Sequence, residues 1–164
     1  MEEAKQVVEI LAAHNLTIAF GESCTGGLLT KLITDVPGAS AVLHGGVCAY
    51  ANEVKEDVLG VPRRLLDEYG AVSAPVAVCM ARGAAEALNT DIGVSTTGIA
   101  GPASDDTEKP VGLVYICISL PRGRYVVREL HLDGDRDAIR TETARQALRL
   151  LLQQKAFFEE ILVF

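Results

Sequence analysis

Hydrophobic positions along the chain fall into short continuous runs that alternate with segments of helical spacing. The run 16–20 is apolar and contains β-branched residues, which predicts a buried strand. Further extended segments are predicted over 41–50, 92–97, 111–120 and 125–132. Helices are predicted over 2–14, 28–33, 52–60, 62–69 and 76–88, with a long helix from 133–135 onwards. Alternating strands and helices followed by a hairpin favour a mixed sheet that helices cover on both faces.

Composition and charge narrow the class of protein. The 164 residues are 49% hydrophobic and contain no internal repeat or linker, so we expect a single domain over 1–164. The formal charge of −7 repels nucleic acid and anionic membranes, and neither is an expected partner. The acidic start of the chain precedes only a short amphipathic run, which predicts neither a signal peptide nor a transmembrane span.

The cysteines and histidines are scattered through the chain. The four cysteines show no CxxC pair or regular spacing, which favours reduced thiols and a cytoplasmic protein. The three histidines are equally dispersed, and we predict no metal site and no cofactor.

The turn at 21–27 is the first candidate site. It joins the predicted strand 16–20 to a predicted helix, and the first N–H groups of a helix lack intrahelical partners. Ser23 would lie beside those donors, and Gly26 and Gly27 would let a ligand approach the backbone. The turn therefore predicts either a nucleophile with an oxyanion or phosphate cradle, or a simple N-cap with glycines for tight packing.

A base for Ser23 is suggested by Lys55. If Asn52 caps the following helix, Lys55 is at its third position, where the helix dipole lowers the pKa of the amine. A neutral lysine acts as a base, and Tyr50 would meet it if Tyr50 ends the strand and Lys55 begins the helix. The alternative is a solvated lysine and a packed tyrosine.

Other side chains are weaker candidates. Cys24 is a rival nucleophile, because a helix N-terminus lowers a thiol pKa, although it could be a small buried hydrophobe. Thr97 and Gly98 end a predicted strand and either line a pocket or form an ordinary turn. Arg136 and Arg140 share a helical face that either grips a phosphate or is solvated. Glu22 either orients a cation or ribose hydroxyl, or pairs with a neighbour.

Taken together, six stretches between about 20 and 145 resemble the CinA C-terminal domain family, which includes stand-alone nicotinamide mononucleotide amidohydrolases. They are Glu22-Ser23-Cys24-Thr25-Gly26-Gly27, Tyr50-Ala51-Asn52-Glu53-Val54-Lys55, Gly70-Ala71-Val72-Ser73, Thr97-Gly98-Ile99-Ala100-Gly101-Pro102, Glu108-Lys109-Pro110-Val111-Gly112 and Gly134-Asp135-Arg136. Such a set in this order is far more specific than any one motif.

The resemblance implies a fold and an activity. The fold is α/β, a three-layer α/β/α arrangement with a mixed, mostly parallel sheet of five to six strands. The activity is hydrolysis of the carboxamide of nicotinamide mononucleotide to nicotinic acid mononucleotide and ammonia, so the expected partner is a small nucleotide. The implied nucleophile is Ser23, assisted by Tyr50 and Lys55. The implied substrate-binding residues are Glu22, Thr25, Gly26, Gly27, Thr97, Gly98, Arg136 and Arg140.

The chain departs from the family pattern at two places. The loop after Pro102 reads Ala103-Ser104-Asp105-Asp106 where the family is usually glycine-rich, and Ala74-Pro75 stand where glutamates are frequent. Both changes bear on substrate affinity rather than on the chemistry. A catalytically silent nucleotide-binding or regulatory module is therefore the alternative function. The apolar tail at 157–164 predicts docking on the domain or on a second copy, which makes a homodimer the expected assembly.

Overall fold

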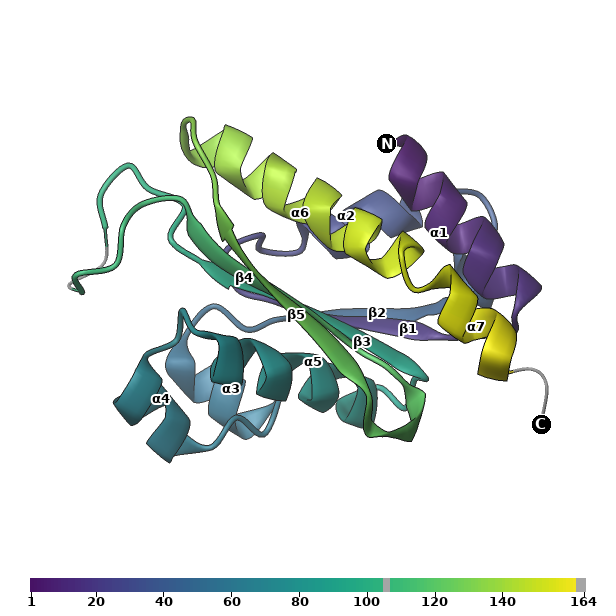
Figure 1. The fold of residues 1–164 in the computed structure, drawn as a ribbon, viewed down its shortest axis with the longest axis horizontal. Helices are drawn as coiled ribbons and strands as arrows, with labels where there is room; N and C mark the ends of the chain where they lie inside the picture. Colours follow the sequence, from purple (N-terminus) through teal and green to yellow (C-terminus); the bar gives the residue numbers. More distant parts are fainter. Residues whose placement is uncertain (105–106, 162–164) are drawn as a thin grey trace.

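A single mixed sheet organises the protein in a computed structural model that describes residues 1–104 and 107–161. Its five strands lie in the order β2-β1-β3-β4-β5 (Figure 1). The strands are β1 (Ile18–Glu22), β2 (Leu43–Cys48), β3 (Ile92–Gly98), β4 (Leu113–Ser119) and β5 (Tyr125–His131). Because β1 pairs in parallel with β2 and β3 while β4 is antiparallel to β3 and β5, four strands run in one direction.

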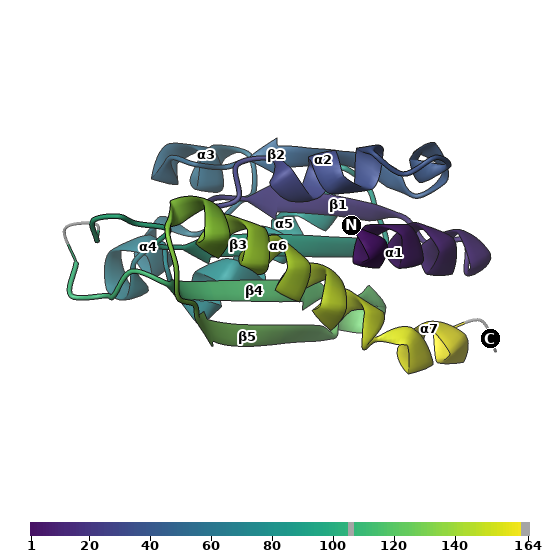
Figure 2. The ribbon, with the colours of Figure 1, turned by 90° about the horizontal axis from the view of Figure 1, so that it is seen from above.

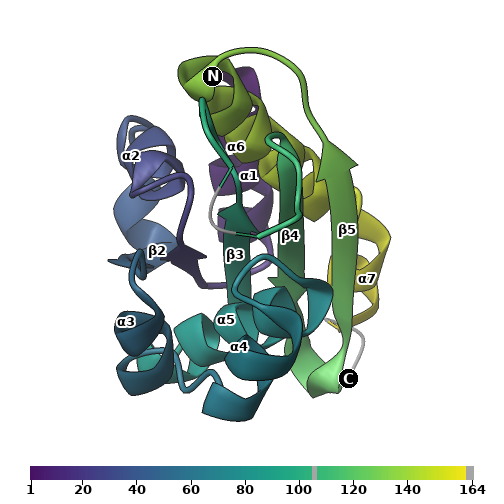
Figure 3. The ribbon, with the colours of Figure 1, turned by 90° about the vertical axis from the view of Figure 1, so that its left-hand side faces the viewer.

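Helices cover both faces of this sheet, as expected for three layers (Figures 2 and 3). One face carries α1 (Glu2–Ala13), α2 (Leu28–Thr34), α6 (Arg136–Leu152) and α7 (Lys155–Ile161). The opposite face carries α3 (Asn52–Asp57), α4 (Arg63–Tyr69) and α5 (Ala74–Ala87). The predicted three-layer α/β/α fold with five to six strands is confirmed.

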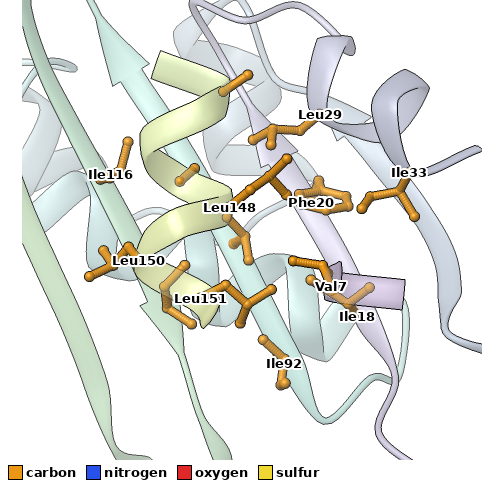
Figure 4. Packing of buried hydrophobic residues seen from close by; sticks show 14 of the residues in the cluster. Val7, Ile18, Phe20, Leu29, Ile33, Ile92, Ile116, Leu148, Leu150 and Leu151 are labelled. Carbon is orange, nitrogen blue, oxygen red and sulfur yellow. The ribbon is translucent and has the colours of Figure 1, made fainter. Parts of the chain in front are cut away.

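The larger core lies between the sheet and α1, α2 and α6. Phe20 of β1 is fully buried there and packs among Leu29 and Ile33 of α2 and Leu148 of α6 (Figure 4). The last helix buries one face in this core, with Ile139, Thr143, Ala147, Leu150 and Leu151. On the opposite face the small side chains of α5 let this helix pack closely on β1, β3 and β4.

Two predicted boundaries were wrong for reasons of sheet pairing and capping. The first strand extends to Glu22, because this central strand pairs Glu22 with Cys48 on one side and Thr96 on the other. The helix predicted from 133–135 onwards begins at Arg136 after its cap Asp135 and ends at Leu152, and 155–161 form the separate α7.

Two glycines in β2, Gly45 and Gly46, mark a bulge and a close approach. The β1–β2 register shifts between Leu43 and Gly45. A Cβ on Gly46 would lie 2.0 Å from the hydroxyl oxygen of Thr30 in α2. The backbone of this edge strand therefore requires glycine where α2 crosses it.

The C-terminal segment docks on its own domain as far as the structure describes it. Phe157 and Phe158 of α7 are buried in the larger core, and Ile161 packs against it. The rest of the predicted apolar tail, 162–164, lies outside the described residues, as do 105–106 of the altered loop. The homodimer stays a prediction. None of the described helices has the length and apolar character needed to cross a membrane.

Candidate active site

The carboxyl ends of β1, β2 and β3 meet at one edge of the sheet. The chain leaves β1 for β2 on one side and returns to β3 on the other, so a crevice forms where neighbouring connections diverge. A pocket of about 220 Å³ lies there. The three predicted catalytic residues Ser23, Tyr50 and Lys55 all line it, together with Thr97, Gly98 and Arg136.

Ser23 lies in a turn directly after β1. It is 8% exposed, and its backbone N–H donates to the carbonyl of Thr96 at 2.9 Å, which extends the pairing with β3. The N–H of Gly26 donates to the Ser23 carbonyl at 3.1 Å and closes the turn. Gly26 and Gly27 have φ of 58° and 96°, a left-handed backbone that favours glycine. The glycines are thus explained by the turn itself.

The donors at the start of α2 are already used by Glu22. Its side chain is 1% exposed and accepts from the N–H groups of Leu29 (2.8 Å) and Thr30 (3.0 Å). The hydroxyls of Thr25 (2.7 Å) and Thr30 (2.8 Å) donate to the same carboxyl group. The anion at this helix terminus is therefore part of the protein, and these N–H groups do not form the open cradle that was one of the two predicted alternatives.

Arg140 of α6 supports the same turn from its other side. Its guanidinium donates to the carbonyl of Cys24 at 3.1 Å and to that of Thr25 at 2.9 Å. A Cβ on Gly26 would lie 3.5 Å from this guanidinium. Of the predicted substrate-binding residues, Glu22, Thr25, Gly26, Gly27 and Arg140 lie in or beside the turn and do not line the described pocket.

Lys55 is buried although it carries an amine. It is 1% exposed, and its Nζ donates to the backbone carbonyl of Tyr50 at 3.0 Å. Burial lowers the pKa of Lys55 from its ordinary value, against smaller opposing effects of Cys24, Cys48 and Glu53. The direction is the predicted one, but its main cause is desolvation. The cap of α3 is Ala51, so Lys55 is the fourth helical residue rather than the third.

Tyr50 follows β2 and is 63% exposed. Its hydroxyl oxygen accepts from Arg136 at 3.2 Å, and the same guanidinium donates to the carbonyl of Gly101 at 2.7 Å. Arg136 thus links the segments that follow β2 and β3 across the mouth of the pocket. The contact between Tyr50 and Lys55 runs through the tyrosine backbone, which residue spacing did not predict.

Thr97 and Gly98 form the end of β3. The Thr97 hydroxyl is used inside the wall, where it donates to the carbonyl of Ala71 at 2.8 Å. A Cβ on Gly98 would lie 2.5 Å from a methyl group of Val114, so the close approach of β4 requires glycine there. Both residues line the pocket, one of the two predicted alternatives, and their own contacts hold the wall together.

Cys24 also lines the pocket, but it lacks the environment of a nucleophile. Burial raises the pKa of the Cys24 thiol to about 12. The predicted lowering by a helix N-terminus is wrong, because the thiol is desolvated and the first N–H groups of α2 bind Glu22. At neutral pH the side chain is a protonated, buried thiol.

Sequence reasoning missed several residues of the lining. Asn52 was assigned to a helix cap, and the segment 70–73 was noted only as a motif. The structure places Asn52, Ala71, Val72 and Ala100 in the pocket wall. No local signal distinguishes such residues, because they come from three separate segments that only the sheet brings together. Among the described residues, no group of three or more His, Cys, Asp and Glu side chains is arranged to hold a metal ion.

Comparison with known proteins agrees with the motifs. The model of the CinA C-terminal domain matches residues 1–155. This chain belongs to the CinA C-terminal domain family. A putative competence-damage inducible protein of Thermoanaerobacter sp. (strain X514) is 51% identical over 151 residues, 92% of this chain and 36% of that protein. A CinA-like protein of Anaeromyxobacter dehalogenans (strain 2CP-1) is 52% identical over 145 residues, 88% of this chain and 35% of that protein.

Solved structures of the CinA superfamily have the same fold. The competence/damage inducible protein CihA of Agrobacterium tumefaciens superposes with a TM-score of 0.89 at 38% identity and covers 93% of both chains. A CinA superfamily protein of Klebsiella pneumoniae superposes with a TM-score of 0.92 at 28% identity over 95% of this chain and 97% of that one. The chain spans about a third of the length of the two curated relatives described above.

Proposed function

We propose that this CinA-family domain hydrolyses the carboxamide of nicotinamide mononucleotide to nicotinic acid mononucleotide and ammonia, with Ser23 as the nucleophile. The observation that carries the proposal is a buried lysine, Lys55, with a lowered pKa in the pocket that Ser23 lines. A lysine becomes a general base only when it is neutral, and burial favours the neutral amine. The substrate is the one implied by the resemblance of the six sequence stretches to the CinA C-terminal domain family.

The reaction follows from the two side chains. Lys55 removes the Ser23 proton while Oγ attacks the carboxamide carbon, and the resulting ammonium donates a proton to the departing nitrogen. Ammonia leaves and an ester to Ser23 remains. Water, deprotonated by the same amine, then hydrolyses the ester to the acid and restores Ser23. The N–H that Lys55 donates to the Tyr50 carbonyl orients the amine without using its lone pair.

Tyr50 and Arg136 have a binding role in this proposal. Both lie at the pocket mouth and are bonded to one another. The guanidinium of Arg136 supplies positive charge for the substrate phosphate in a protein of net charge −7. The exposed Tyr50 phenol positions substrate, and the deeper Ser23 and Lys55 carry out the chemistry.

Release of ammonia from nicotinamide mononucleotide by the purified protein tests the proposal. We expect turnover by the wild type and its loss, by about 10³-fold or more, in Ser23→Ala and Lys55→Met. Cys24→Ala is the matched control in the same turn and should keep most of the activity. Turnover that Ser23→Ala leaves unchanged would refute the assignment.

A silent nucleotide-binding module is the second candidate, favoured by the acidic residues in the 103–106 loop. Calorimetry with the same nucleotide separates the two functions. Binding without ammonia release supports the silent module, and turnover excludes it.

A further inference from the structure

One wall of the pocket is an irregular segment between α4 and α5. Ala71 and Val72 from this segment line the pocket together with Ser23. Because the segment belongs to neither helix nor sheet, its backbone carbonyls need other partners to hold their positions.

Side chains supply those partners at four consecutive carbonyls. Ser73 donates to the carbonyl of Gly70 at 2.8 Å, and Thr97 donates to that of Ala71 at 2.8 Å. The other two carbonyls, of Tyr69 and Val72, each accept from Nζ of Lys109 at 2.6 Å. Lys109 is thus the one described side chain that spans the segment and holds both of its ends.

Lys109 reaches this segment from a distant part of the chain. It lies in the connection between β3 and β4, 37 residues beyond Val72. Gly70 makes room for it, since a Cβ on Gly70 would lie 3.1 Å from Nζ and the φ of 78° favours glycine. The motif that contains Gly70 and the motif that contains Lys109 therefore contact one another in the folded protein.

We propose that Lys109 is a positioning residue that fixes the backbone of 69–72 and so holds the pocket wall formed by Ala71 and Val72 in place for substrate binding. This role rests on the proposed amidohydrolase function for its kinetic consequence. The ammonium makes charge-assisted hydrogen bonds to both carbonyls, which are stronger than neutral ones. Lys109 is absent from the pocket lining, so it acts through Ala71 and Val72 rather than by touching substrate.

Removing the amine should change binding more than chemistry. Lys109→Met keeps most of the apolar stem and leaves the carbonyls of Tyr69 and Val72 without this donor. Ser23 and Lys55 belong to other segments and keep their own contacts. A displaced wall therefore weakens the complex while kcat changes little.

The experiment measures kcat and KM for nicotinamide mononucleotide in Lys109→Met, Lys109→Arg and the control Lys5→Met. We expect KM to rise about tenfold in Lys109→Met while kcat stays within about twofold of wild type. This loss of affinity is in the range expected for one hydrogen bond to a charged group. Lys109→Arg keeps cationic donors and should recover part of the affinity. Lys5 is an exposed lysine paired only at 3.9 Å with Glu9, and its variant should behave as wild type.

Hydrogen exchange provides a readout that needs no substrate. Amides of 70–73 should exchange faster in Lys109→Met, while those of β1 and β3 stay protected. An unchanged KM with unchanged local exchange overturns the proposal, and so does a loss confined to kcat. If the wild type releases no ammonia, the proposed function fails, and exchange at 70–73 still decides whether Lys109 holds the wall.

Discussion

The buried carboxyl group of Glu22 should be the strongest stabilising element of the Ser23 turn. In Glu22→Gln the side-chain oxygen still accepts hydrogen bonds, but the amide nitrogen replaces the oxygen that accepts from the N–H and hydroxyl of Thr30. Both part-buried donors of Thr30 then lose a charged acceptor, and the Thr30 N–H faces an N–H donor. At about 1.5–3 kcal/mol for a hydrogen bond to a charged group, we expect a loss of about 2–4 kcal/mol.

That loss is a large fraction of the 5–15 kcal/mol, roughly, that stabilises a typical domain. At about 2–4 °C per kcal/mol for a chain of this size, Tm should fall by roughly 5–15 °C. Thermal and urea unfolding followed by circular dichroism measure the change, with Glu53→Gln as control because Glu53 is exposed in the first turn of α3. Because Glu22 precedes Ser23, kcat should fall as well. A Tm within about 1 °C of wild type would refute this account of the turn.

Three further predictions follow from Lys55, Cys24 and Arg136. As pH rises, kcat/KM should increase through the lowered pKa of Lys55, with a midpoint below the roughly 10.4 of free lysine, because the neutral amine is active. The unfolding free energy should also rise with pH between the lowered pKa of Lys55 in the folded protein and that of free lysine, because in this range the unfolded state binds more protons than the folded state. Lys55→Met should remove both pH dependences. Iodoacetamide at neutral pH should modify exposed Cys48 before Cys24, whose thiol has a pKa of about 12, and mass spectrometry that finds Cys24 modified first contradicts this. Arg136→Met should raise KM for nicotinamide mononucleotide about tenfold or more, and KM for the riboside, which lacks the phosphate, much less. An equal effect on both substrates would contradict a role of Arg136 in binding the phosphate.

The order of strands and helices could be predicted from the sequence, because burial periodicity and Gly, Pro and Asp punctuation act over a few residues. Ser23, Tyr50 and Lys55 were identified as a set through the resemblance to the family, and all three line the pocket.

Only the tertiary structure decided what each neighbouring group does. The sequence left open whether Glu22 meets a ligand or a neighbour, and its carboxyl group accepts from the first N–H groups of α2, which lie seven and eight residues along the chain. Arg136 and Arg140 share a helical face, but one lines the pocket and the other holds the Ser23 turn. Local pattern records which residues are apolar or flexible, whereas hydrogen-bond partners and desolvation depend on segments that meet only when the sheet is assembled.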